Sequence, residues 1–542
     1  MHANRHAGVA ALALLAACSP GKGDPYDPGT DLPANEADAA RMVQQATFGV
    51  DDASLRRLMY LGYTTWLREQ FEKPASLHRP WLQEQLDLGA TLSQRHRVTR
   101  WWQLAIQGED QLRQRVAFAL SEILVISDRG GGLESDVLGG ASYYDLLVTG
   151  AFGSYRELLE AVTLSPQMGV YLSMLRNRKP DLARNIQPDE NYAREIMQLF
   201  SIGLVKLRED GTPELDSNNQ EIPTYDQDVI VGIAHAFTGW NYARATSWGG
   251  ATPNHLPMEP WEDYHDRNAK LVLDGRVLPQ ARSAREELVD ILDQLAAHPN
   301  VGPFLGKQLI QRLVTSNPSP AYVGRIARVW ADNGSGQRGD LRAVVQAILL
   351  DDEARNGHRT APVTFGKLRE PLLRQTALWR AFKARAADGL YDDLADPSNT
   401  FGQGPLQAQT VFNFFRPDHR PPGPVADAGL LGPEFQILTH SLITSTTNAY
   451  ESQVFRGHVG YASARPDQVL LDLSAERALA ADPAALVARL DRLLLAGQMT
   501  PEMRNVVTNH VSAEPLANGN GLQRALEAVY LVISSPEFAI QK

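Results

Sequence analysis

Apolar side chains recur at the spacing of an α-helix through much of the chain. Asp110 offers a helix N-cap, and apolar residues then follow four positions apart at Leu112, Val116 and Leu120. Glu122 falls on another side of the same helical wheel. A stripe of this kind is typical of a helix that buries one face against a core.

Proline and glycine mark the ends of further helices. Asp482-Pro483 predicts a helix start, Gly497 predicts its end, and Thr500-Pro501 predicts the start of the next helix. Only residues 212–223 have the pattern of a β-hairpin. We therefore predict an all-α fold, a large bundle-like body of many helices with one short hairpin and less than about a tenth of its residues in strands.

A segment rich in glycine and proline, residues 400–433, interrupts this helical pattern. Such a segment is either a linker between domains or an ordered loop within one domain. We interpret residues 36–542 as a single large helical domain that contains residues 400–433 as an ordered loop.

The net charge of the chain limits the classes of molecule that it is expected to bind. The 542 residues include 52 Lys and Arg against 63 Asp and Glu, which gives a net charge of −11. An acidic total argues against binding to nucleic acid or to an anionic membrane surface, because both need a basic footprint. The chain also lacks the short motifs of serine hydrolases, zinc proteases and nucleotide-binding loops.

The N-terminal residues predict export and a lipid anchor. A short apolar run with small residues at its end leads to Cys18, the one cysteine of the chain, and Leu15-Ala16-Ala17-Cys18 resembles a bacterial lipobox. We predict a lipoprotein signal peptide over residues 1–18 and a flexible Pro/Gly tether over residues 19–35. Lipidation at Cys18 would attach the protein to the cell envelope, at the outer membrane. The alternative is an ordinary signal peptide with a chance cysteine.

Side chains that could act in catalysis or ligand binding are most concentrated between Pro188 and Phe200. At 100° per residue, five polar side chains fall within about 140° of a helical wheel, namely Glu190, Asn191, Arg194, Glu195 and Gln198. Two carboxylates, an amide and a guanidinium on one face can supply an acid and a base, or bind a polar ligand. The alternative is an ordinary solvated helix face.

A second candidate group follows in residues 225–270. His265-Asp266 and the nearby Lys270 offer an acid–base pair and a cation, whereas the simpler interpretation of a His-Asp pair in a loop is turn capping. Trp240 begins a stretch rich in aromatic residues. Such residues either stack on sugar rings or pin a long loop to the body.

The segments around these candidates resemble the exported bacterial family catalogued as domain of unknown function 1800. The resemblance rests on residues 188–195, 222–225, 237–240, 265–270, 45–49, 112–120, 298–301 and 411–415. It implies a large, mainly helical, exported protein whose family has no agreed activity. It also implies a genomic neighbour, an exported protein related to sulfatases, and hence work on an extracellular polymer.

We therefore expect a hydrolase-like enzyme that acts on an extracellular polysaccharide or another polymer. The expected roles are acid and base for Glu190 and Glu195, assistance by His265 and Asp266, substrate binding by Asn191, Arg194 and Lys270, and sugar stacking on Trp240. Two carboxylates in such an arrangement suit the ~5–10 Å separation of glycoside chemistry. If these residues are functional, they should converge in one cleft.

Two alternatives stay open. The first is a non-catalytic scaffold or polymer-binding lipoprotein, in which these ion pairs lock helices together. The second and weaker one is a metal-dependent phosphohydrolase built on His235, His265 and Asp266, which lacks a convincing fourth ligand. The sequence identifies no cofactor and no substrate.

Overall fold

The computed structural model describes residues 31–250, 255–465, 467–513, 516 and 520–542. The signal peptide, Cys18 and most of the predicted tether lie outside these residues. The fold is mainly helical, as predicted.

The first part of the described chain is helical. Its helices are α1 (Glu36–Ala46), α2 (Asp52–Leu61), α3 (Tyr63–Glu72), α4 (Arg79–Asp87), α5 (Gln94–Gln107), α6 (Gln111–Ser121) and α7 (Val137–Gly150). The middle of the chain forms α8 (Tyr155–Thr163), α9 (Pro166–Tyr171), α10 (Asn191–Gln198), α11 (Gln227–Ala236), α12 (Ala284–Ala297), α13 (Val301–Leu313), α14 (Pro320–Ala331), α15 (Leu341–Leu350) and α16 (Asp352–Thr360).

The remaining helices follow residue 370. They are α17 (Pro371–Ala381), α18 (Pro397–Phe401), α19 (Pro424–Asp427), α20 (His440–Arg456), α21 (Ser474–Ala478), α22 (Pro483–Leu495), α23 (Pro501–Ser512), α24 (Gly521–Ile533) and α25 (Pro536–Ala539). Short 3-10 turns are η1 (Leu182–Arg184), η2 (Glu262–Tyr264), η3 (Leu273–Gly275), η4 (Asp392–Leu394) and η5 (Pro433–Ile437).

Strands are short and antiparallel. They pair as β1 (Trp240–Asn241) with β2 (Glu259–Pro260), β3 (Lys270–Leu271) with β4 (Val277–Leu278), and β5 (Lys367–Leu368) with β6 (Ile540–Gln541). The predicted hairpin at 212–223 forms as isolated bridges, including Leu215 with Glu221, and a bridge from Leu207 to Pro213 adds a third segment. Sequence analysis missed the three strand pairs, because two residues are too few to show an alternating pattern.

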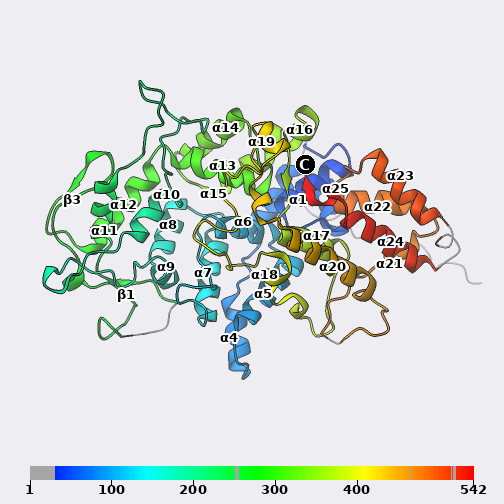
Figure 1. Ribbon diagram of the computed structural model, residues 1–542, viewed down its shortest axis with the longest axis horizontal. Helices are drawn as coiled ribbons and strands as arrows, with labels where there is room; N and C mark the ends of the chain where they lie inside the picture. The colour runs from blue at the N-terminus through cyan, green and yellow to red at the C-terminus, as the bar shows by residue number, and fades with distance from the viewer. Residues whose placement is uncertain (1–30, 251–254, 466, 514–515, 517–519) are drawn as a thin grey trace, which may run out of the picture.

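The molecule is elongated, with α11, α12 and β3 at one end and α21, α23 and α24 at the other (Figure 1). The last helices return to the start of the chain, so that α22 packs on α1 and α17. None of the described helices is long and apolar enough to cross a membrane.

Helix α6 lies near the middle and packs against α1, α3, α5, α7 and α13. Because neighbours cover it on several sides, even its polar residues Gln111, Gln114 and Arg115 are buried. Buried polar groups need partners inside the protein. The centre of this fold therefore has to contain a network of polar side chains.

Candidate functional site

The polar residues predicted on one face of α10 occupy two different environments. Glu190 is the half-exposed N-cap residue, and its Oε2 accepts hydrogen bonds from Arg194 at 3.1 Å and from Gln227 on α11 at 2.8 Å. Asn191 is exposed. Glu195 is only 6% exposed, its Oε2 has no hydrogen-bond partner among the described residues, and burial raises its pKa. The two carboxylates therefore do not share one accessible surface.

Trp240 is buried in β1, with 1% of its surface exposed. It offers no free ring face to a sugar. Elsewhere in the loop, Trp248 stacks on Tyr264 with ring centroids 3.9 Å apart and planes 4° from parallel. These aromatic residues pack on one another and hold the loop to the body.

The second predicted group is a buried network. Lys270 Nζ lies 2.9 Å from Glu287 on α12 and donates to the carbonyl oxygen of Asp266 at 2.5 Å, while His265 Nε2 lies 3.3 Å from Glu287. Asp266 Oδ2 lies 2.5 Å from Nδ1 of His235 on α11. Burial alone acts to raise the pKa of Asp266, but the hydrogen bond with His235 and the surrounding charges lower it to about 2. The network joins α11, α12 and β3 and leaves its ions little access to solvent.

The two predicted groups lie near opposite ends of α11. Gln227, which contacts Glu190, begins the helix, and His235, which contacts Asp266, lies eight residues later. Eight residues of α-helix span about 12 Å. The structure thus keeps the two groups apart rather than gathering them in one cleft.

The weaker alternative, a metal-dependent phosphohydrolase, would need His235, His265 and Asp266 to be arranged around a metal ion. In the described part of the chain, no group of three or more His, Cys, Asp and Glu side chains is arranged to hold a metal ion. Both ring nitrogens of His265 face protein oxygens, with Nδ1 lying 3.0 Å from the carbonyl oxygen of Thr238 and Nε2 facing Glu287. These residues do not fit a metal site.

A different pocket, which we call the central pocket, opens beside the C-terminal end of α6. It encloses about 250 Å³. Its apolar lining comes from Ile123, Leu199, Leu204, Phe304, Val411, Phe412 and Phe415. Its polar lining includes Glu122, Gln308, Arg312 and Gln198, the last residue of α10. An apolar pocket with a few convergent polar groups is the usual form of a binding or active site.

The polar floor of the central pocket belongs to a buried ionic cluster. Its members, each less than 5% exposed, are Arg115, Glu122, Arg312, Lys367, Glu370 and Glu434. Arg312 Nε lies 3.4 Å from Glu122 Oε2, and Lys367 Nζ lies 3.0 Å from Glu434 Oε1. The side-chain amide of Gln403 donates to Glu122 at 3.2 Å and to Glu370 at 2.7 Å. Residues from five separate stretches of sequence thus meet under one pocket.

Glu122 and Glu370 are driven toward opposite protonation states. Burial, the neighbouring charge of Glu370 and a hydrogen bond to it raise the pKa of Glu122 well above its ordinary value. Burial acts to raise the pKa of Glu370 too, but the charge of Lys367 and the hydrogen bond from Glu122 outweigh burial and lower it. A protonated Glu122 that donates to an ionised Glu370 satisfies both shifts. A carboxyl pair of this kind marks an acid–base site.

Two polar atoms of this pocket lack hydrogen-bond partners among the described residues. They are Gln308 Nε2 and Arg312 Nη1. An unpaired buried polar atom costs about 1–3 kcal/mol, so native proteins rarely keep such atoms in purely structural positions. Two of them beside one pocket indicate a place for polar atoms of a ligand.

Comparison with known proteins places the chain in a family. The family model described as "Protein of unknown function (DUF1800)" matches residues 41–540. The chain belongs to this family. Neither the curated proteins nor the solved structures contain a match to it.

In this DUF1800 chain, one of the segments that carry the family resemblance lines the central pocket and another contributes to the ionic cluster beneath it. Residues 411–415 supply Val411, Phe412 and Phe415 to the lining, while residues 112–120 lie in α6, supply Arg115 to the cluster and end two residues before Glu122. Sequence analysis did not select Glu122, because a glutamate off the apolar stripe is usually solvated. Its place two residues after one such segment was the signal that could have selected it.

Proposed function

We propose that the protein is a hydrolase-like enzyme of the cell envelope that acts on an extracellular glycan or a related polymer through the central pocket. The observation that carries this proposal is the Glu122 carboxyl at the floor of an apolar pocket, whose pKa is raised well above its ordinary value by burial and by the charge of Glu370. A carboxylic acid that stays neutral at physiological pH is suited to donate a proton to a leaving group.

The surrounding residues have matching roles. Glu122 would release to the leaving-group oxygen the proton that it shares with Glu370 before the reaction, and the adjacent cations Arg312 and Lys367 would offset the second carboxylate charge that this leaves. The guanidinium of Arg312, held over the Phe415 ring at 4.3 Å, would stabilise negative charge that develops in the transition state. Phe412, at 43% exposure, offers an aromatic face at the pocket mouth where a sugar ring can stack.

The activity can be sought directly. The purified full chain is incubated with a panel of bacterial exopolysaccharides, and new reducing ends are counted against a Glu122→Gln preparation as the background. We expect release from at least one polymer by the wild-type protein only. Equal release by both proteins, or none from any polymer, would contradict the hydrolase proposal.

The second candidate function is a non-catalytic scaffold or polymer-binding lipoprotein. The observation in its favour is the Lys270–Glu287 pair, in which both side chains are at most 2% exposed and no substrate can reach them. Such a pair defines how helices meet rather than performing chemistry. A lipoprotein that binds polymer without cleaving it would satisfy this alternative.

The proposed attachment of the protein to the membrane depends on Cys18. Cys18→Ser is expected to abolish lipid attachment, because the thiol is the group that accepts the diacylglycerol. Metabolic labelling of cells with a clickable fatty acid measures this. Equal labelling of the wild-type and Cys18→Ser proteins would contradict a lipid anchor at this position.

A further inference from the structure

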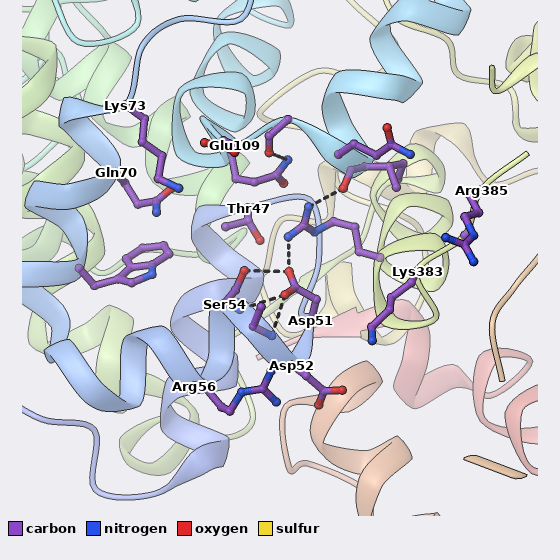
Figure 2. Close-up of a pocket in the computed structure, with 18 residues that line it drawn as sticks. Thr47, Asp51, Asp52, Ser54, Arg56, Gln70, Lys73, Glu109, Lys383 and Arg385 are labelled. Carbon is purple, nitrogen blue, oxygen red and sulfur yellow. Dashed lines mark hydrogen bonds and ion pairs between the residues drawn. The ribbon is translucent and has the colours of Figure 1, made fainter. Parts of the chain in front are cut away.

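A second and larger cleft lies on another part of the molecule. It encloses about 560 Å³ and is bounded by the start of α2, the end of α3, the loop between α5 and α6, and the segment that follows α17 (Figure 2). It shares no lining residue with the central pocket. We call it the cationic cleft, because its lining includes Arg56, Lys73, Lys383 and Arg385.

Two acidic residues of this cleft already have cationic partners. Asp51 pairs with Arg380, and both carboxylate oxygens of Asp52 accept hydrogen bonds from Arg489, at 2.8 and 3.0 Å. Burial acts to raise the pKa of Asp51, but the charge of Arg380 and hydrogen bonds from Ser54 lower it on balance. The hydrogen bond from Arg489 likewise lowers the pKa of Asp52. Both acids are therefore ionised and held by arginines, of which Arg489 also pairs with the buried Glu476 at 2.6 Å.

Four cations of the cleft have no such partner. Among the described residues, the side chains of Arg56, Lys73, Lys383 and Arg385 make no hydrogen bond or ion pair, and Glu109 is the one carboxylate of the lining that is left to oppose them. Lys73 approaches from one side of the cleft, Lys383 and Arg385 from the other, and Arg56 from a third (Figure 2). The charges of Lys383 and Arg385 also reach Asp472, whose pKa is lowered chiefly by its hydrogen bonds with Ser474.

This local surplus of positive charge contrasts with the net charge of −11 for the whole chain. Like charges that crowd a concave surface repel one another unless an anion is bound between them. An acidic protein that places four cations without hydrogen-bonded partners around one cleft offers a surface suited to an anion. The separation of the cations on different walls suits a ligand with more than one anionic group.

Gln70 adds an independent requirement. It lines the cleft, is 5% exposed, and its Oε1 is buried without a hydrogen-bond partner among the described residues. A carboxamide can accept a hydrogen bond from a hydroxyl and donate one to an oxygen. Gln70 stands beside Lys73 on the same wall (Figure 2). The ligand should therefore present a hydroxyl group close to an anionic group.

We propose that the cationic cleft binds an acidic saccharide, a sugar chain that carries carboxylate or sulfate groups. Its anionic groups lie between Lys73, Lys383 and Arg385, and one of its hydroxyls bonds Gln70. A cleft of this volume is within the ~300–1,000 Å³ range of ligand sites and holds more than a single inorganic anion. The proposal concerns binding alone and stands whether or not Glu122 is catalytic.

Calorimetric titration of the purified full chain tests this. The probes are trigalacturonate, a chondroitin sulfate oligosaccharide, neutral maltotriose and inorganic sulfate. We expect one or both acidic oligosaccharides to bind more tightly than maltotriose and sulfate, with affinity that falls as salt is added. Lys383→Ala combined with Arg385→Ala should weaken this binding by roughly tenfold, because partly exposed ion pairs contribute modestly and two are removed.

The matched control removes two positive charges outside the cleft, through Arg68→Ala on α3 and Arg477→Ala on α21, both of which are exposed and have no side-chain partner among the described residues. It should bind as the wild type does. Gln70→Leu should weaken binding of the oligosaccharide but not of sulfate. Failure of both acidic oligosaccharides to exceed maltotriose, or equal losses in the two double variants, would overturn the proposal. Sulfate bound as tightly as the oligosaccharides, with Gln70→Leu silent, would overturn its saccharide part.

Discussion

Replacing Glu122 by Gln is expected to lower turnover of the polymer substrate by roughly 10²–10⁴-fold, the usual contribution of a general acid. The amide has the shape of a protonated carboxyl, so it can accept from Gln403 and donate to Glu370 as Glu122 does. It cannot release a proton to a leaving group. The fold should therefore persist, with a melting temperature no lower than that of the wild type, while the reaction is lost.

The matched control for this variant is Asp418→Asn, the same acid-to-amide change at the rim of the same pocket. Asp418 is exposed and pairs with Arg416 at 2.9 Å, an arrangement that contributes little to stability. Its turnover should stay close to that of the wild type. If Glu122→Gln and Asp418→Asn retain equal turnover, Glu122 is not the acid.

Replacing Lys270 by Met is expected to lower the free energy of unfolding by roughly 3–5 kcal/mol, because it leaves a buried ion without its partner. Glu287 is fully buried, and the remaining polar side chain beside it is His265 at 3.3 Å. Chemical denaturation of the two proteins measures the difference. This outcome would assign Lys270 to holding α12 and β3 together rather than to binding substrate.

Arg276→Met, immediately before β4, is the control for Lys270→Met. Arg276 pairs with Asp290 at 2.9 Å but is 48% exposed, so its loss should change stability by less than about 1 kcal/mol. Adding Glu287→Met to Lys270→Met removes the stranded charge and should recover much of the lost stability. A Lys270→Met protein as stable as the wild type would contradict the buried-pair interpretation.

Local signals were sufficient to predict much of the helical fold. The starts of α22 at Pro483 and of α23 at Pro501 follow from the capping side chains of Asp482 and Thr500, whereas Asp110 precedes α6 without a side-chain cap hydrogen bond. Helix caps and apolar periodicity act over a few residues, so a single sequence reveals them. The short strand pairs could not be predicted from local patterns. The pair of β5 and β6, for example, joins residues that are far apart in the chain.

The candidate site was harder to predict, because its residues meet only through tertiary packing. Glu122, Arg312, Glu370 and Glu434 come from distant segments, and no local spacing links them. Conversely, the dense polar pattern of residues 190–195 was visible in the sequence but combines a surface ion pair with the isolated, buried Glu195. A helical wheel gives direction around one helix and says nothing of which neighbours cover it.

The central claim is that Glu122 keeps its proton in the folded protein, and the pH dependence of stability tests it most directly. An unfolded glutamate has a pKa of about 4.3, so above that pH the folded state would hold a proton that the unfolded state releases. The wild-type free energy of unfolding must then fall as pH rises, relative to Glu122→Gln, which has no proton to lose at this position. We predict that the advantage of Glu122→Gln grows by up to about 1.4 kcal/mol per pH unit until the raised pKa of Glu122 is passed. A stability difference that stays constant between about pH 5 and about pH 8 would show that Glu122 is ionised in the fold, and would contradict the account.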